Sequence, residues 1–228
     1  MKKRLAKEAQ NQSQFDAYEK QGGVLLGPYT SHIWRSDPKK LLFLLARYKF
    51  CARMLAGKKN VLEIGCGDAF GTAIVLQGVG HVHGIDFEPL VIKANSDRLE
   101  YGGRATFEVL DITRKKLSTQ FDGAFALDVI EHIPENLEQK FMKNITASLK
   151  VDAVSIIGTP NLTASAYASA GSAAGHVNLK SAESLKKLMA NHFQNVFIFS
   201  MNDELVHTGF YPMAHYIFAV GTNLKRKA

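Results

Sequence analysis

The sequence has no long apolar stretch. Among its 228 residues, no uninterrupted apolar run approaches the roughly 20 residues that a membrane-spanning helix needs. The basic start of the chain, residues 1–8, is not followed by the apolar run of a secretory signal. Hydrophobic side chains still make up 46% of the chain, which is enough to bury one core of ordinary size. We therefore expect a soluble, cytoplasmic protein with no membrane partner.

Cysteine is scarce. The two cysteines, Cys51 and Cys66, do not form a Cys-x-x-Cys pair. Neither a disulfide framework nor a cysteine-based zinc site is therefore indicated. The small number of cysteines is in keeping with a protein of a reducing compartment.

Acidic residues are outnumbered by basic ones, and the net charge of +7 raises the question of a nucleic-acid surface. Many of the basic residues gather at the two ends of the chain: Lys2, Lys3, Arg4, Lys7, Lys225, Arg226 and Lys227. Solvated chain ends often carry such charge without a partner. The charge distribution therefore argues against a nucleic-acid partner and leaves it as an alternative.

The hydrophobic pattern changes period several times along the chain, in an order that alternates between helix and strand. Strands are predicted at residues 61–65, 82–85, 106–110, 123–127 and 153–157. Helices are predicted at residues 38–56, 69–76 and 89–99, and from residues 134 and 181 onward. The helix from residue 134 carries Leu137, Phe141, Ile145 and Leu149 at intervals of four. Strands that alternate with helices form a parallel sheet covered on both faces.

Two further strands, residues 196–201 and 214–220, are separated by the loop 202–213 and are expected to form an antiparallel pair at the sheet edge. The predicted fold is an α/β, doubly wound, seven-stranded, mostly parallel sheet with helices on both faces. We expect one domain over residues 38–228, with its core motifs in residues 58–160. Two segments outside this scheme could cover a pocket: the N-terminal extension 1–37, as a lid, and the Ala-, Ser- and Gly-rich segment 162–178, whose alternative is a surface loop without a task.

A glycine-rich turn joins the first predicted strand to the helix that follows. In the sequence EIGCGDAFG at residues 63–71, the glycines allow a ligand to lie against bare backbone. Asp86 ends the next strand, 19 positions beyond Gly67, where a carboxylate can accept both ribose hydroxyls. Phe70 stands where a dinucleotide-binding loop has its third glycine, and the Gly-Lys-Ser/Thr ending of a phosphate-binding loop is missing. The turn therefore favours a nucleoside ligand without phosphates.

These features resemble the class I S-adenosylmethionine-dependent methyltransferases, well over residues 58–160 and loosely over the C-terminal strand pair. The resemblance implies S-adenosylmethionine as the cofactor. It places the methionine part beside Glu63, Gly65, Cys66 and Gly67. It also places the ribose at Asp86, the adenine beside Phe87, and the adenine amino group near Asp111 and Ile112. Asp128, in the sequence ALDVIEHIP at residues 126–134, matches the motif after the fourth strand and completes the implied cofactor set.

Methyl transfer from a sulfonium needs few catalytic residues, because the leaving group departs neutral and a base has to remove only one proton. Histidine is the natural base near neutral pH. His132 is a candidate because it follows the Asp128 strand end, and His176 because the chain is expected to return over the pocket there. The candidates for substrate contact are Tyr29, His32, Trp34, His207 and Tyr211. For each histidine, a hydrogen-bonded structural role is the alternative.

We expect a small-molecule acceptor, with O-methylation of a sugar, nucleotide sugar or phenol favoured over N-methylation. The sequence lacks the Asn/Asp-Pro-Pro-Tyr/Phe motif of amino-group base methyltransferases and the cysteine pair of 5-methylcytosine RNA enzymes. An RNA methyltransferase and a cofactor-binding module without catalysis are the alternatives. An NAD-dependent oxidoreductase is disfavoured by Phe70.

A metal-assisted mechanism is a further alternative, although no metal is expected. Asp128, Glu131 and His132 resemble the acid-x-x-Glu-His pattern through which ubiquinone-pathway O-methyltransferases are thought to hold a divalent ion. Such an ion could lower the pKa of a hydroxyl. Neighbouring positions 131 and 132 cannot face one direction on a regular helix, whereas a loop allows it.

Overall fold

The structure is a computed structural model that describes residues 5–98 and 101–225. The end of one predicted helix, at Leu99, lies outside the described residues, as do the terminal basic residues Lys2, Lys3, Arg4, Arg226 and Lys227. Among the helices of the described part, none has the length and apolar character needed to cross a membrane.

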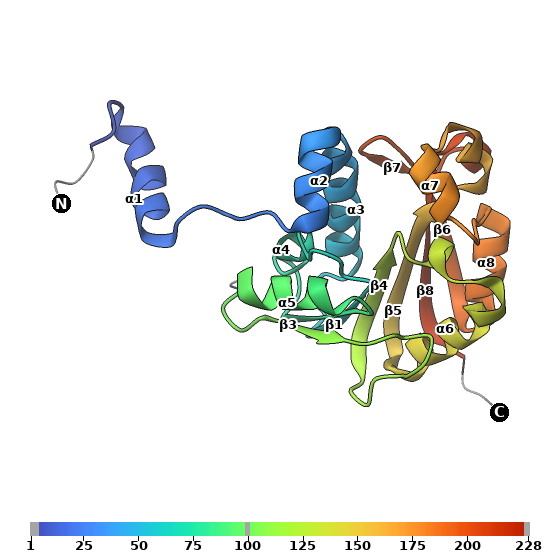
Figure 1. The fold of residues 1–228 in the computed structure, drawn as a ribbon. Coiled ribbons are helices and arrows are strands. Elements are labelled where there is room, and N and C mark those ends of the chain that lie inside the picture. The colour runs from blue at the N-terminus through green and yellow to red at the C-terminus, as the bar shows by residue number, and fades with distance from the viewer. Residues whose placement is uncertain (1–4, 99–100, 226–228) are drawn as a thin grey trace.

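One eight-stranded sheet forms the centre of the molecule, in the order β3-β2-β1-β4-β5-β8-β6-β7 (Figure 1). In chain order the strands are β1 (Asn60–Ile64), β2 (His81–Asp86), β3 (Ala105–Val109), β4 (Phe121–Leu127), β5 (Leu149–Pro160), β6 (Phe193–Asn202), β7 (Leu205–His207) and β8 (Tyr216–Leu224). Strands β1 to β5 pair in parallel, and β8 pairs antiparallel with both β5 and β6. The predicted mostly parallel sheet with antiparallel C-terminal strands is confirmed.

The predicted number of seven strands is wrong, because residues 202–213 are not only a loop. Strand β7 lies within this segment and pairs antiparallel with the end of β6. Asp203 has a φ of 49° in the left-handed region, which aspartate tolerates, and this allows the tight turn between the two strands. A three-residue strand is too short to produce a recognisable alternation in the sequence.

Helices precede the sheet and cover its faces. The α-helices of the described residues are α1 (Gln12–Gln21), α2 (Pro28–Ser36), α3 (Lys40–Met54), α4 (Thr72–Val75), α5 (Pro89–Arg98), α6 (Glu135–Ala147), α7 (Ala170–Gly175) and α8 (Ala182–Ala190). Short 3-10 helices are η1 (Ala9–Asn11), η2 (Ile130–His132), η3 (Leu162–Tyr167) and η4 (Tyr211–Met213). The predicted alternation of strands and helices is therefore present.

Three helical segments differ from their prediction. Helix α4 is shorter than the predicted 69–76, because Ala69 has a φ of 50° and belongs to the glycine-rich turn. Helix α6 ends at Ala147, and Leu149 opens β5 instead of continuing the helix. Residues 162–178 contain η3 and α7, whose first turns are capped by the side chains of Asn161 and Ser169.

Each face of the sheet has its own apolar core. Helices α3 and α4 pack on one face, where Leu55, Phe125 and Phe218 are buried. Helices α6 and α8 pack on the other, where Phe141 and Ile145 are fully buried, as their four-residue spacing predicted. Because both faces are filled, the strand ends are the part of the sheet open to a ligand.

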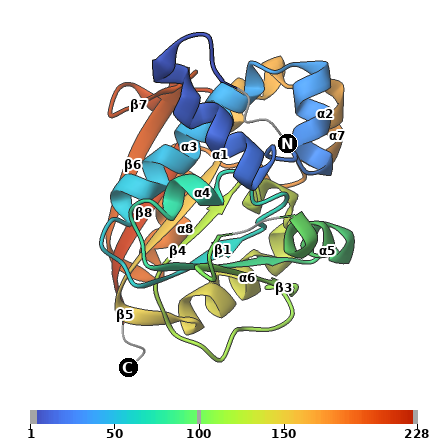
Figure 2. The same cartoon turned by 90° about the vertical axis from the view of Figure 1, so that its left-hand side faces the viewer.

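The N-terminal extension has two unlike parts. Helix α1 has no buried residue and stands away from the sheet at the end of an extended segment (Figure 1). Helix α2 instead lies at the end of the sheet where the parallel strands finish, and α7 stands at the same end (Figures 1 and 2). Within the extension, α2 is therefore the helix in position to cover a site at the strand ends.

Candidate functional site

A cavity of about 540 Å³ opens at the carboxyl ends of the parallel strands. Its walls come from the turns that follow β1, β2, β3 and β4, together with α2 and α3. The strand order reverses between β1 and β4, and doubly wound sheets bind ligands at such a reversal. The volume is that of a small-molecule site.

The glycine-rich turn after β1 forms the floor of this cavity. Gly65 has a φ of 66°, and a β-carbon at this position would lie 2.4 Å from Cγ2 of Val129. Only glycine therefore fits, because a side chain would meet both backbone strain and a clash. The chain passes the cavity as bare backbone at Gly65 and Gly67, with Cys66 buried between them.

Asp86, at the end of β2, is held by two backbone amides. Gly67 N–H donates to one carboxylate oxygen and Glu88 N–H to the other, each at 3.0 Å. Each oxygen has two lone-pair directions, so the carboxylate is fixed in place and can still accept bonds from a ligand. Phe87 lies beside it at the cavity with 74% of its surface exposed, and this leaves the aromatic ring free to cover a ligand.

Asp111 and Ile112 line the same wall, after β3. Asp111 accepts hydrogen bonds from the backbone and hydroxyl of Thr113, at 2.9 and 2.6 Å, and forms an ion pair of 3.1 Å with the exposed Arg114. These bonds are those of an aspartate that caps a turn. Ile112 is buried and adds apolar surface to the wall.

Glu63 does not line the cavity, unlike the other residues of the implied cofactor set. Its side chain is 1% exposed and accepts hydrogen bonds from the hydroxyls of Tyr48, at 2.8 Å, and Thr72, at 2.6 Å. Burial raises the pKa of this carboxyl to about 7. Glu63 therefore joins β1 to α3 and α4 behind the glycine-rich turn.

Asp128 directly follows β4, has a φ of 56° and lines the cavity. One of its carboxylate oxygens forms an ion pair of 2.6 Å with Arg47 of α3. The guanidinium of Arg47 in turn lies 3.8 Å from the ring centre of Tyr216, so the pair is backed by a cation–π contact. Sequence reasoning did not single out Arg47, because the helix predicted at residues 38–56 carried no candidate site residue.

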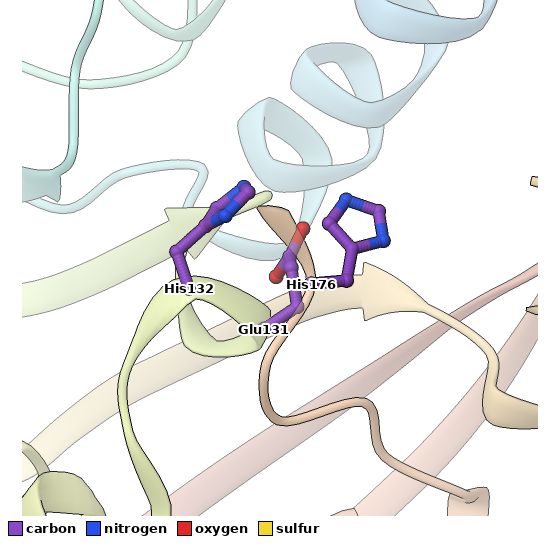
Figure 3. Close-up of side chains that lie close together, drawn as sticks. All are labelled: Glu131, His132 and His176. Carbon is purple, nitrogen blue, oxygen red and sulfur yellow. The ribbon is translucent and has the colours of Figure 1, made fainter. Parts of the chain in front are cut away.

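Glu131, His132 and His176 meet beside the cavity (Figure 3). Each offers one ligand atom, and these atoms lie within 4.8 Å of one another. His132 also lines the cavity, and the rings of His132 and His176 meet edge-on with centroids 5.1 Å apart. The metal alternative from the sequence combined Glu131 and His132 with Asp128. In the structure, the third residue of this group is His176 instead.

His132 is held in a defined orientation. Its Nδ1 lies 2.9 Å from the carbonyl oxygen of Gly175, the last residue of α7. A carbonyl can only accept, so Nδ1 carries the proton and a neutral ring presents a lone pair at Nε2. The segment 162–178 thus contributes to the site by orienting this histidine.

Glu131 is fully buried beside the two histidines. Its Oε2 accepts a hydrogen bond of 2.9 Å from Thr159, whereas Oε1 has no hydrogen-bond partner in the described part of the chain. Burial, and then the charge of Asp128, raise the pKa of Glu131 to about 8. Burial and His132 lower the pKa of His176. Together, Glu131, His132 and His176 can accept a proton or bind a cation.

Comparisons with known proteins agree with this site. The methyltransferase domain family model matches residues 61–152, which span the glycine-rich turn, Asp86, Asp111, Asp128 and the histidine-bearing turn. The solved structure of the N-methyltransferase NodS from Bradyrhizobium japonicum WM9, in complex with S-adenosyl-l-homocysteine, has a TM-score of 0.60, with 16% identity over 83% of this chain and 91% of that one. Residues 61–152 thus match a methyltransferase domain, and the fold is that of the class I S-adenosylmethionine-dependent methyltransferases. S-adenosylmethionine is the cofactor of this family.

Curated relatives of this chain carry two kinds of name. A ubiquinone biosynthesis O-methyltransferase from Haemophilus ducreyi is 33% identical over 124 residues, which are 51% of this chain and 51% of that protein. A ribosomal protein L11 methyltransferase from Thermosipho africanus is 32% identical over 110 residues, 48% of this chain and 40% of that protein. The chain thus spans about half the length of the first relative and 40% of the length of the second.

The predicted candidates for substrate contact are not gathered in one place. Tyr29 lines the cavity, while His32 and Trp34 lie on the exposed side of α2. Both ring nitrogens of His207 are engaged inside the β6–β7 region, by Asn202 and the backbone of Gly209. Tyr211 donates a hydrogen bond to Glu183 of α8 at 2.9 Å.

Several lining residues were missed because they lie on helices of unknown placement. Leu44 and Tyr48 belong to the apolar face of α3, and the pattern of that face does not tell a cavity wall from a core. Asp68 directly follows Gly67 and could have been noticed there. Its carboxylate accepts a hydrogen bond of 2.6 Å from the backbone N–H of Thr30 in the first turn of α2. This bond holds α2 over the cavity.

Proposed function

We propose that this chain transfers the methyl group of S-adenosylmethionine to a hydroxyl group of a small molecule. The observation that carries the proposal is His132, a base at the cavity wall whose Nδ1 is tied to Gly175 and whose Nε2 is available. The O-methyltransferase name of the Haemophilus ducreyi relative supports transfer to oxygen.

The residues present fit the cofactor. The glycine-rich turn leaves space that a β-carbon at Gly65 would fill, and Asp86 offers lone pairs for ribose hydroxyls. Phe87 and Ile112 give apolar surface for the adenine, and the cavity is large enough for a molecule of this size. Glu63 is left out of the contact set, because its side chain faces the other way.

The bound cofactor would supply an electrophilic methyl group on a positively charged sulfur. The protein's own part is to orient the acceptor hydroxyl and to remove its proton. His132 Nε2 can take this proton, because the bond from Nδ1 to Gly175 fixes both the tautomer and the ring. His176 packs against His132, and its lowered pKa keeps it neutral near pH 7 as a second proton acceptor.

The cavity wall favours an apolar acceptor. Beyond the turns assigned to the cofactor, its apolar side chains are Ile33, Leu44, Val129 and Ile133. Tyr29, Thr30, Tyr48 and His132 also line it, and the Tyr48 hydroxyl is engaged by Glu63. A sugar needs several hydrogen-bonding side chains, because buried hydroxyls without partners are costly. Among the three acceptor classes predicted from the sequence, we therefore propose a phenol.

A divalent ion at Glu131, His132 and His176 is the second candidate. The unpartnered Oε1 of buried Glu131 favours it, because a cation would satisfy this oxygen. Two imidazoles and one carboxylate suit zinc or a similar ion. An ion there would lower the pKa of the acceptor hydroxyl, in place of proton removal by His132.

Calorimetric titration with S-adenosylhomocysteine and NAD, followed by methyl transfer to matched panels of phenols and sugars, tests the proposal. Binding of the first ligand alone, with transfer to phenols that persists in a chelator, is expected for the histidine mechanism. Activity that chelation abolishes and zinc restores would support the ion instead. Salt-sensitive RNA binding would favour the RNA alternative, and cofactor binding without transfer to any acceptor would favour a non-catalytic module.

A further inference from the structure

The two carboxylate oxygens of Asp128 have different surroundings. Its Oδ2 lies 2.6 Å from Nη1 of Arg47, a residue 81 positions earlier in the chain. Among the described residues, no protein group donates a hydrogen bond to Oδ1. The side chain is 31% exposed and lines the cavity. One oxygen is therefore engaged by the protein and the other is available to a ligand.

Arg47 is held in turn. Its side chain is 16% exposed, and its guanidinium lies 3.8 Å from the ring centre of the fully buried Tyr216. A planar guanidinium over an aromatic ring has little rotational freedom, so the nitrogen that faces Asp128 is fixed. Nε of Arg47 is buried without a hydrogen-bond partner in the described part of the chain. The ion pair with Asp128 is thus the main polar contact of this guanidinium.

The backbone of Asp128 is equally constrained. Its N–H donates to the carbonyl of Gly158 at 3.1 Å, and its φ is 56°. With the main chain and Oδ2 both fixed, Oδ1 has one direction left. Without Arg47, the carboxylate of Asp128 would lie near the buried Glu131 with no positive charge beside it. The charge of Arg47 compensates for both acids.

We propose that Arg47 is a positioning residue for cofactor binding: it turns Asp128 so that Oδ1 accepts a hydrogen bond from a charged or polar N–H group of S-adenosylmethionine. This inference rests on the proposed function, because it requires the cavity to bind that cofactor. Arg47 itself does not touch the ligand. Its effect on affinity passes entirely through Asp128.

The test is a double-mutant cycle on the affinity for S-adenosylhomocysteine, measured by calorimetry on the full chain. Arg47→Met keeps the length of the side chain and removes its charge, and Asp128→Asn keeps a residue type that tolerates the left-handed backbone. Each single variant is expected to bind at least tenfold more weakly. The double variant should bind no more weakly than Asp128→Asn alone, because Arg47 acts only through that carboxylate.

Two further variants separate positioning from bulk stability. Arg53→Met, an exposed arginine on the same helix, is the matched control and should bind as the wild type does. Arg47→Lys retains the charge without the planar stack, so about threefold weaker binding is expected, between the wild type and Arg47→Met. If Arg47→Met does not fold, as judged by circular dichroism, Arg47→Lys and its double variant with Asp128→Asn carry the cycle.

The outcomes are distinct. Wild-type affinity in Arg47→Met or Arg47→Lys, or fully additive losses in the double variant, would overturn the positioning role while leaving the proposed function intact. A wild-type protein that binds no S-adenosylhomocysteine would overturn the proposed function, and this inference with it.

Discussion

Replacing Glu63 by glutamine is expected to remove a pH-dependent loss of stability. In the folded protein, burial raises the pKa of Glu63 to about 7, against the ordinary value of 4.5. Between these values the folded state binds the proton more tightly than the unfolded chain does. The stabilisation from the protonated carboxyl is therefore fully present below pH 4.5 and is lost as the pH rises through 7.

The size of the effect follows from the two pKa values. At about 1.4 kcal/mol per pH unit, the full loss amounts to about 3 kcal/mol, most of it between pH 5 and pH 8. Glutamine cannot ionise, and the hydroxyls of Tyr48 and Thr72 can each donate or accept, so Glu63→Gln keeps the buried contacts. The variant should match the wild type at pH 5 and exceed its stability at pH 8 by about 2 to 3 kcal/mol.

Urea unfolding at pH 5, 6, 7 and 8 measures this difference. For a typical slope of about 2 kcal/mol per molar, the urea midpoint of the variant should lie about 1 M above that of the wild type at pH 8. Glu204→Gln, which changes an exposed glutamate, is the matched control and should run parallel to the wild type. If the stability of Glu63→Gln also ran parallel to that of the wild type from pH 5 to pH 8, Glu63 would not be the cause of the pH dependence. A large loss of cofactor affinity in Glu63→Gln at pH 5 would return Glu63 to the binding site.

Four other predictions follow from the cavity and the core. Asp86→Ala should weaken S-adenosylhomocysteine binding by roughly 30-fold or more in calorimetry, because a charged acceptor contributes about 1.5 to 3 kcal/mol per hydrogen bond; unchanged affinity would remove Asp86 from the site. His132→Gln should lower kcat by about 10² to 10⁴ with nearly unchanged cofactor affinity, and an unaltered kcat would exclude it as the base. In NMR titrations the pKa of His176 should lie below 6.5 and rise in His132→Ala, because His132 lowers it. An unchanged pKa in this variant would show that the two rings do not interact. Phe141→Ala, at a fully buried position, should cost about 3 to 5 kcal/mol in urea unfolding, and a loss below about 1 kcal/mol would contradict the packing of α6.

Local signals predicted which residues gather at the glycine-rich end of the cavity. The glycine-rich turn, Asp86, Asp111 and Asp128 all lie at strand ends, and parallel neighbouring strands bring such ends to one edge of the sheet. The period of α6 correctly predicted Phe141 and Ile145 as core residues. Short elements were harder, because β7 spans only three residues and α7 only six.

The part of the cavity beside the histidines could not be predicted, because it depends on contacts between distant segments. His176 meets His132 from 44 positions away, because α7 returns over the turn after β4. Arg47 reaches Asp128 from α3, a helix in which the sequence indicated no site residue. His207, expected near the substrate, is instead engaged within its own hairpin.

The sequence by itself determined the doubly wound fold, the glycine-rich turn and the acids at the strand ends. These features follow from hydrophobic period and from backbone preferences that act over a few residues. Only the tertiary structure decided that Glu63 faces away from the cavity, that His176 joins Glu131 and His132, and that Arg47 holds Asp128. Such choices depend on which helix packs on which face of the sheet, and this is settled by side-chain packing between segments far apart in the chain.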